Sequence, residues 1–115
     1  MRRAARILLL FYTLNRILGY ALPILDVDLD ESKAVFETNF FGRVALTQAF
    51  APLLIESKGI IVNIGSISGF CPTPFSGIYN ACCAAVHQWS DTLRLEMKPF
   101  GVKVILVRRP MSLKI

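Results

Sequence analysis

Cysteine and histidine are scarce in this chain, which has three cysteines and a single histidine in 115 residues. An odd number of cysteines, two of them adjacent, is a poor basis for a disulfide framework. Cys83 and His87 are four residues apart and would share a helix face, but no further ligands stand at zinc-like spacings. We therefore expect no metal site, buried free thiols and an intracellular, reduced protein.

Acidic residues are missing from the two ends of the chain. Residues 1–16 carry four arginines and no acid, and residues 108–115 carry three basic residues, so the net charge of +5 is concentrated there. A nucleic-acid-binding surface needs a basic stripe with interleaved aromatics on one face. Charges at opposite termini do not form such a stripe, and we expect no nucleic-acid partner.

Long apolar runs are also absent, since no stretch reaches the eighteen residues of a membrane span. The N-terminal sequence MRRAAR-ILLLFYTL has the basic and apolar parts of a signal peptide, but no A-x-A-like cleavage site follows. Two interpretations stay open. Ile7–Thr13 is a buried strand, or residues 1–16 have a targeting or membrane-surface role.

The middle of the chain opens with a long predicted helix, residues 28–58. Asp28 and Glu31 form a capping-box pattern at its start, and Lys58-Gly59 supplies a basic last turn and a glycine C-cap. Thirty residues is long for one helix, so we expect a bend near Asn39.

Strands and helices alternate through the rest of the sequence. Residues 59–67 are a β-branched run whose apolar residues occupy both parities, which predicts a strand buried on both faces. A helix with Ser76 as its side-chain N-cap follows over residues 76–98, and then a strand over residues 102–107. This alternation predicts right-handed crossovers and a parallel sheet, an α/β fold of about three strands and two long helices.

Three polar residues fall where chemistry could occur. Asn39 lies in ETNFFG on the first helix, Ser66 lies in GSISG at the end of a strand, and Tyr79 opens the next helix thirteen residues later. Side chains at the carboxyl end of a parallel strand project into the ligand crevice of the sheet. Singly, each residue has a simpler explanation as a bend, a turn residue or a packed ring.

Together with their flanking residues, these positions resemble the catalytic segment of the short-chain dehydrogenase/reductase family. The resemblance covers residues 19–107, between a divergent basic and apolar segment (1–18) and a divergent tail (108–115). It implies a partial Rossmann-like sheet. NIGSISG, PTPFSGIYN and AAVHQWSDTLRLEMKPFGVKV are most similar to fungal NADPH-dependent 1-acyldihydroxyacetone-phosphate reductases.

The resemblance implies hydride transfer between NADP(H) and a carbonyl carbon, here of a lipid-like ketone in glycerolipid and phosphatidic acid synthesis. Tyr79 would be the general acid, Ser66 would hold the substrate oxygen, and Asn39 would organise a water chain. Tyr79 and Asn15 would contact the cofactor. Asn15 is the one residue of the family's Asn-Asn-Ala-Gly motif that this sequence keeps. The endoplasmic reticulum or the lipid-droplet surface is the location that the resemblance implies.

Two departures argue against activity of the chain alone. The family's lysine, which lowers the pKa of the tyrosine and binds the nicotinamide ribose, is replaced by Cys83. A neutral thiol supplies no cation, and a thiolate would raise the pKa of the tyrosine. The Gly-rich phosphate-binding turn is also missing. We therefore expect an inactive, truncated copy.

A different class of function remains open beside the enzyme fragment. In this family the two long helices commonly form the subunit interface, so the chain could be an interaction protein. It would then form a homodimer, or pair with a full-length homologue and modulate it. A third alternative is the membrane-surface role of the arginine-rich N-terminus.

Overall fold

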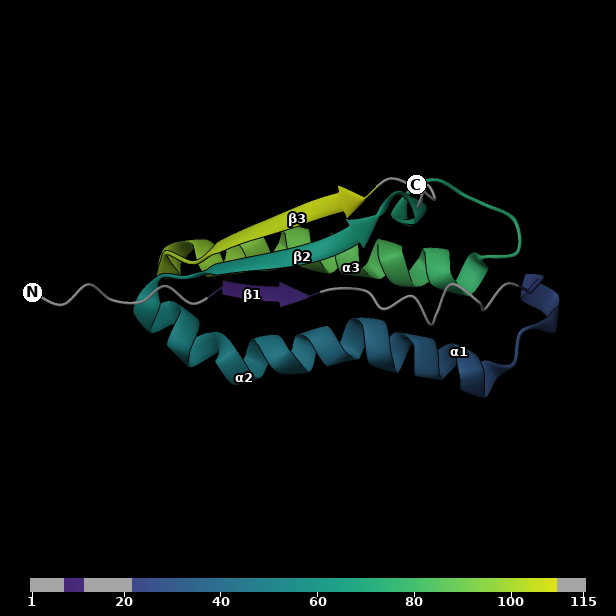
Figure 1. Cartoon of the computed structure of the whole chain (residues 1–115), viewed down its shortest axis with the longest axis horizontal. Coiled ribbons are helices and arrows are strands. Elements are labelled where there is room, and N and C mark those ends of the chain that lie inside the picture. The colour runs from purple at the N-terminus through teal and green to yellow at the C-terminus, as the bar shows by residue number, and fades with distance from the viewer. Residues whose placement is uncertain (1–7, 12–21, 110–115) are drawn as a thin grey trace, which may run out of the picture.

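The computed structural model describes residues 8–11 and 22–109, which form a three-stranded parallel sheet with helices (Figure 1). The strands are β1 (Leu8–Phe11), β2 (Ile60–Ser66) and β3 (Lys103–Arg109), in the order β1-β2-β3. The register pairs Leu8 with Ile60 on one side of β2, and Ile60 with Lys103 on the other. The predicted parallel sheet is confirmed, and β1 lies within the strand expected at residues 7–13.

The long helix predicted over residues 28–58 is interrupted at its middle. It consists of α1 (Leu29–Phe36), a π-helical turn (Glu37–Phe41) and α2 (Gly42–Ser57). The Asp28 carboxylate accepts a hydrogen bond of 2.9 Å from the Glu31 N–H, as the capping box predicts. A bend was expected near Asn39, and the structure has this π-helical turn there, a form often found at functional sites.

The end of α2 differs from the prediction. Lys58, and not Gly59, adopts the left-handed conformation, with φ 51° and ψ 53°. The Gly59 carbonyl already accepts a hydrogen bond of 3.2 Å from the Lys103 N–H, at the entrance of the sheet. Because Gly59 already bonds to the strand β3, the left-handed residue that ends α2 is Lys58, one residue earlier.

The second long helix is α3 (Gly77–Met97), which leads through a 3-10 turn (Lys98–Phe100) to β3. Two further 3-10 turns cover Ile24–Asp26 and Ile67–Gly69. Ser76 is the N-cap residue, but its side chain makes no capping bond among the described residues, contrary to the prediction. Asn80 instead ties the preceding loop to the helix, because its Nδ2 donates to Thr73 Oγ1 at 3.1 Å.

Both long helices pack on the same face of the sheet. The main core cluster joins Leu54 of α2, Met97 of α3 and Ile61 of β2, together with Val102 and Val104. Right-handed crossovers between neighbouring strands place successive helices on one side. The prediction that β2 is buried on both faces is therefore wrong: alternate residues are buried, and those between them are half-buried.

The other face of the sheet is open in the described residues. Ile105 and Val107 of β3 point there and are 44% and 40% exposed. They lie beside Val62 and Ile64 of β2 in the register. No helix among the described residues has both the length and the apolar character needed to cross a membrane.

Candidate active site

Ser66 is the last residue of β2, at the carboxyl end of the sheet. Its Oγ accepts a hydrogen bond of 3.1 Å from the Ser68 N–H, which starts the 3-10 turn Ile67–Gly69. Its own N–H donates to Nε2 of His87 at 3.2 Å. The strand end and α3 therefore hold the backbone of Ser66 from two sides.

Tyr79 lies on the first turn of α3, where its hydroxyl reaches Ser66 and Cys83. Burial raises the pKa of Tyr79 to about 12, and the negative charge of a Cys83 thiolate and a hydrogen bond with Cys83 act in the same direction. A hydrogen bond with the Ser66 side chain opposes them. Thus the structure brings Ser66, Tyr79 and Cys83 together, and it leaves the phenol a weaker acid than free tyrosine.

Cys83 is buried beside the phenol. Burial raises the pKa of its thiol, while a hydrogen bond with Tyr79 and the positive charge of Arg43 lower it. The raised pKa keeps the thiol neutral at neutral pH. Position 83 therefore supplies no cation to Tyr79, in agreement with the argument from the sequence.

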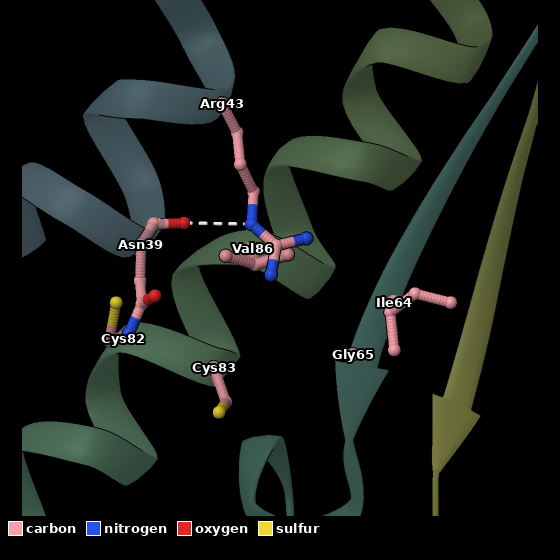
Figure 2. A pocket seen from close by; sticks show the side chains of 7 residues that line it. All are labelled: Asn39, Arg43, Ile64, Gly65, Cys82, Cys83 and Val86. Carbon is pink, nitrogen blue, oxygen red and sulfur yellow. Dashed lines mark hydrogen bonds between the residues drawn. The ribbon is translucent and has the colours of Figure 1, made fainter. Parts of the chain in front are cut away.

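Asn39 lies on the π-helical turn and is 6% exposed. Its backbone carbonyl accepts a hydrogen bond of 2.8 Å from Nε of Arg43 (Figure 2). Asn39 also lines a cavity of about 10 Å³ with Cys82 and Cys83. A cavity of this size has room for about one water molecule. The role of Asn39 in a water chain stays a prediction.

Arg43 is a residue that the sequence argument missed. It is only 5% exposed, and its guanidinium extends from α2 towards α3, on the cavity that Cys83 also lines (Figure 2). Burial lowers its pKa, and the charges of Cys82, Cys83 and Tyr79 raise it. The inward face of α2 carries Arg43, Thr47 and Leu54. Arg43 follows Asn39 by four residues, and this helical spacing could have placed both residues on one face. Because α2 is apolar around much of its circumference, the sequence did not show which face is buried.

Three further polar residues of the interior join β2 to α3. They are His87, Ser90 and Asn63, and Asn63 Nδ2 donates to Ser90 Oγ at 2.7 Å. Cys82, Val86 and Met97 of α3 are apolar, recur at helical spacing and are buried. His87 and Ser90 lie one residue beyond Val86 and Trp89 on the same broad face, so helical spacing could have included them.

The described residues meet only part of what a nicotinamide cofactor needs. Ser66 and Tyr79 offer two hydroxyls, but position 83 holds a neutral thiol beside a cavity of about 10 Å³. The cation of Arg43 is engaged with the Asn39 carbonyl. Asn15 lies outside the described residues. The described residues do not by themselves fit NADP(H).

Comparisons with known sequences point to one family. A family model described as short chain dehydrogenase matches residues 17–112. Short-chain dehydrogenase ptmH of Penicillium ochrochloron is 46% identical over 89 residues, which are 77% of this chain and 33% of the relative. Short-chain dehydrogenase virD of Hypocrea virens is 43% identical over 97 residues, 84% and 34% of the two chains. This chain spans about a third of the length of these curated relatives.

Solved structures agree with the sequence comparisons. A short-chain dehydrogenase from Burkholderia cenocepacia, in complex with NADP, matches with a TM-score of 0.78 and 31% identity, over 90% of this chain and 43% of that one. One from Streptomyces avermitilis matches with a TM-score of 0.72 and 34% identity, over 76% and 33% of the chains. The names of these proteins do not specify an acyldihydroxyacetone-phosphate reductase, so that part of the resemblance stays a prediction.

Proposed function

We propose, because this chain belongs to the short-chain dehydrogenase family, that it is the serine–tyrosine segment of an NADP(H)-dependent reductase of lipid-like ketones. We propose further that the chain alone does not catalyse this reduction. The placement of Tyr79 on the first turn of α3, near enough to Ser66 at the carboxyl end of β2 for that serine to lower its pKa, and beside a neutral Cys83, carries this proposal. The resemblance of NIGSISG and PTPFSGIYN to 1-acyldihydroxyacetone-phosphate reductases is the support for an O-acylated hydroxyketone as substrate and for the endoplasmic reticulum or lipid droplet as location.

In this mechanism the two hydroxyls act on one carbonyl oxygen. Ser66 Oγ donates a hydrogen bond to it and Tyr79 supplies the proton that converts the developing alkoxide into an alcohol. A general acid works best when its pKa lies near the working pH. With a pKa of about 12, Tyr79 remains protonated at neutral pH and transfers its proton reluctantly. The chain therefore keeps the positioning of the site and has lost its acid strength.

A hybrid enzyme tests the proposal. Residues 19–107 replace the matching segment of the Penicillium ochrochloron relative, and NADPH oxidation is followed with a 1-acyldihydroxyacetone phosphate and with a short, water-soluble ketone. We expect little turnover with Cys83, turnover of the acyl substrate after Cys83→Lys combined with Arg43→Met, which removes the neighbouring buried charge, and loss of that turnover when Tyr79→Phe is added.

Three results would count against it. Equal turnover with Cys83 and with lysine would refute the lost acid strength, and full activity of Tyr79→Phe would refute the role of the phenol. A preference for the short ketone would refute the lipid-like substrate. The native chain assayed alone is the matched control, and it should oxidise no NADPH.

The exposed face of α2 supports a second function, that of an interaction protein. Leu46, Phe50 and Leu53 recur at helical spacing and are each more than a third exposed. Matching helices in a full-length relative would present the corresponding surface, and we propose such a relative as the partner. Apolar patches of this kind mark interaction sites.

Charge on this face should abolish pairing. We expect Leu46→Asp with Phe50→Asp to prevent co-sedimentation of the chain with the Penicillium ochrochloron relative. Thr92→Asp, at an exposed position of α3, is the matched control and should leave co-sedimentation unchanged. Trp89 is a poorer site for this test, because its ring packs edge-on against Phe40 with centroids 6.0 Å apart. Association that survives the double substitution would show that α2 is not the interface.

A further inference from the structure

The imidazole of His87 is enclosed by the turn that carries Ser66. His87 lies near the middle of α3 and is buried, and its Nε2 accepts the Ser66 N–H at 3.2 Å. A Cβ atom added to Gly65 or to Gly69 would collide with the ring. The Phe70 ring lies beyond it, with centroids 6.0 Å apart. Glycines on both sides of Ser66 thus let the backbone approach the imidazole closely.

The hydrogen bond defines the protonation state of the ring. Because Nε2 accepts, the imidazole is neutral and carries its proton on Nδ1. Burial is the main cause that lowers the pKa of His87, and Arg108 of β3 and Arg43 of α2 lower it further. Asp91, one turn along α3, acts in the opposite direction. The cations on β3 and α2 therefore favour the neutral ring, and the carboxylate of Asp91 on α3 opposes them.

We propose that neutral His87 is a positioning residue for Ser66, which holds the serine backbone by its acceptor nitrogen and releases it when the imidazole is protonated. Protonation places a second N–H opposite the Ser66 N–H, and two donors cannot bond to each other. The turn that holds the Ser66 hydroxyl beside Tyr79 then loses its tie to α3. The effect on catalysis rests on the proposed function, whereas the hydrogen bond and its loss do not.

The full chain allows a direct test, because His87 is its single histidine. Amide and imidazole NMR signals are followed between pH 8 and pH 4.5. We expect the Ser66 amide proton to shift upfield with the same midpoint as the His87 ring, while the amide of exposed Leu95 does not follow. A Ser66 amide that ignores the titration of His87 would overturn the proposal.

Two variants separate positioning from packing. His87→Gln keeps an acceptor that does not titrate, so the Ser66 amide should remain downfield and lose its pH dependence. His87→Leu fills the space without an acceptor, so that amide should be upfield at every pH. Identical behaviour of the glutamine and leucine variants would refute the role of the acceptor nitrogen.

Unfolding provides a readout that needs no resonance assignment. A base whose pKa is lower in the folded state binds fewer protons there than in the unfolded chain, so stability falls as the pH drops below about 6.5. The urea midpoint of the native chain should fall in that window, and His87→Gln should remove the decrease. An equal decrease in the variant would assign it to other groups and contradict the proposal.

The hybrid enzyme tests whether the hydrogen bond between His87 and Ser66 affects activity. In the hybrid that carries Cys83→Lys and Arg43→Met, kcat/KM should decline on the acid side of the pH profile with the midpoint of His87, and His87→Gln should remove that decline. If the hybrid shows no turnover, the proposed function fails while the NMR titration still decides the role of His87. If the hybrid is active and its acid limb is unchanged by glutamine, positioning by His87 does not limit catalysis and the catalytic part of the inference fails.

Discussion

Replacing Cys83 with lysine should lower the pKa of Tyr79 by about 2, provided that Arg43 is made neutral at the same time. A cation within hydrogen-bonding range favours the phenolate by Coulomb attraction, and opposite charges at such distances lower a pKa by about 1–3. Burial is the main cause that raises the pKa of Tyr79 to about 12, and the substitution removes the thiol, whose thiolate charge and hydrogen bond raise that pKa further. Both changes act in the same direction.

Arg43 is the reason for the second substitution. A lysine at position 83 would line the same cavity as the guanidinium, and both charges would be buried at once. Like charges in a site of low dielectric oppose each other, so the new ammonium would deprotonate or destabilise the fold. Arg43→Met keeps much of the apolar stem and removes the charge. Cys83→Lys alone should therefore lower the pKa of Tyr79 less than the double variant does.

The measurement is the alkaline absorbance of the phenolate. Tyr12→Phe and Tyr20→Phe leave Tyr79 as the only tyrosine, and urea unfolding at each pH checks that the chain remains folded. Cys83→Met, in the presence and absence of Arg43→Met, is the matched uncharged control. If methionine lowers the pKa as far as lysine does, the effect comes from loss of the thiol and the charge argument fails. Equal pKa values for the single and double lysine variants would exclude the coupling to Arg43.

Local patterns predicted the elements of this fold well. The capping box at Asp28 and the β-branched run before Ser66 each depend on a few neighbouring residues. Their physical causes act within one helical turn or one strand. For the same reason the meeting of Ser66 with Tyr79 followed from strand polarity, since a helix that begins beyond a strand end returns over that end.

Contacts between elements were harder to predict. Arg43 was not predicted to be a site residue, since an isolated arginine on a helix is usually solvated. Its burial depends on packing against α3 next to the π-helical turn, and no local sequence pattern specifies such a turn. The half-open face of β2 likewise depends on where both helices pack, and the composition of the strand alone does not determine that.

A second large effect is expected at the polar pair that joins β2 to α3. Asn63 and Ser90 are both fully buried, and Asn63 Nδ2 donates to Ser90 Oγ at 2.7 Å. Among the described residues the Oδ1 atom of Asn63 has no partner. Ser90→Ala conserves volume but leaves the whole amide without a partner. We expect it to lower the free energy of unfolding by about 2 kcal/mol, since stranding a buried polar group costs about 1–3 kcal/mol.

Removing both polar groups should restore most of that loss. Asn63→Val with Ser90→Ala leaves no buried donor or acceptor at the contact, and a β-branched residue suits the middle of a strand. Asn63→Val alone should cost less than Ser90→Ala, because a serine hydroxyl inside a helix can bond to the carbonyl four residues before it. Urea unfolding of the four proteins measures the coupling. Additive losses would contradict the contact, whereas a double variant close to the native chain would show that the loss in Ser90→Ala comes from the buried amide of Asn63 left without a partner.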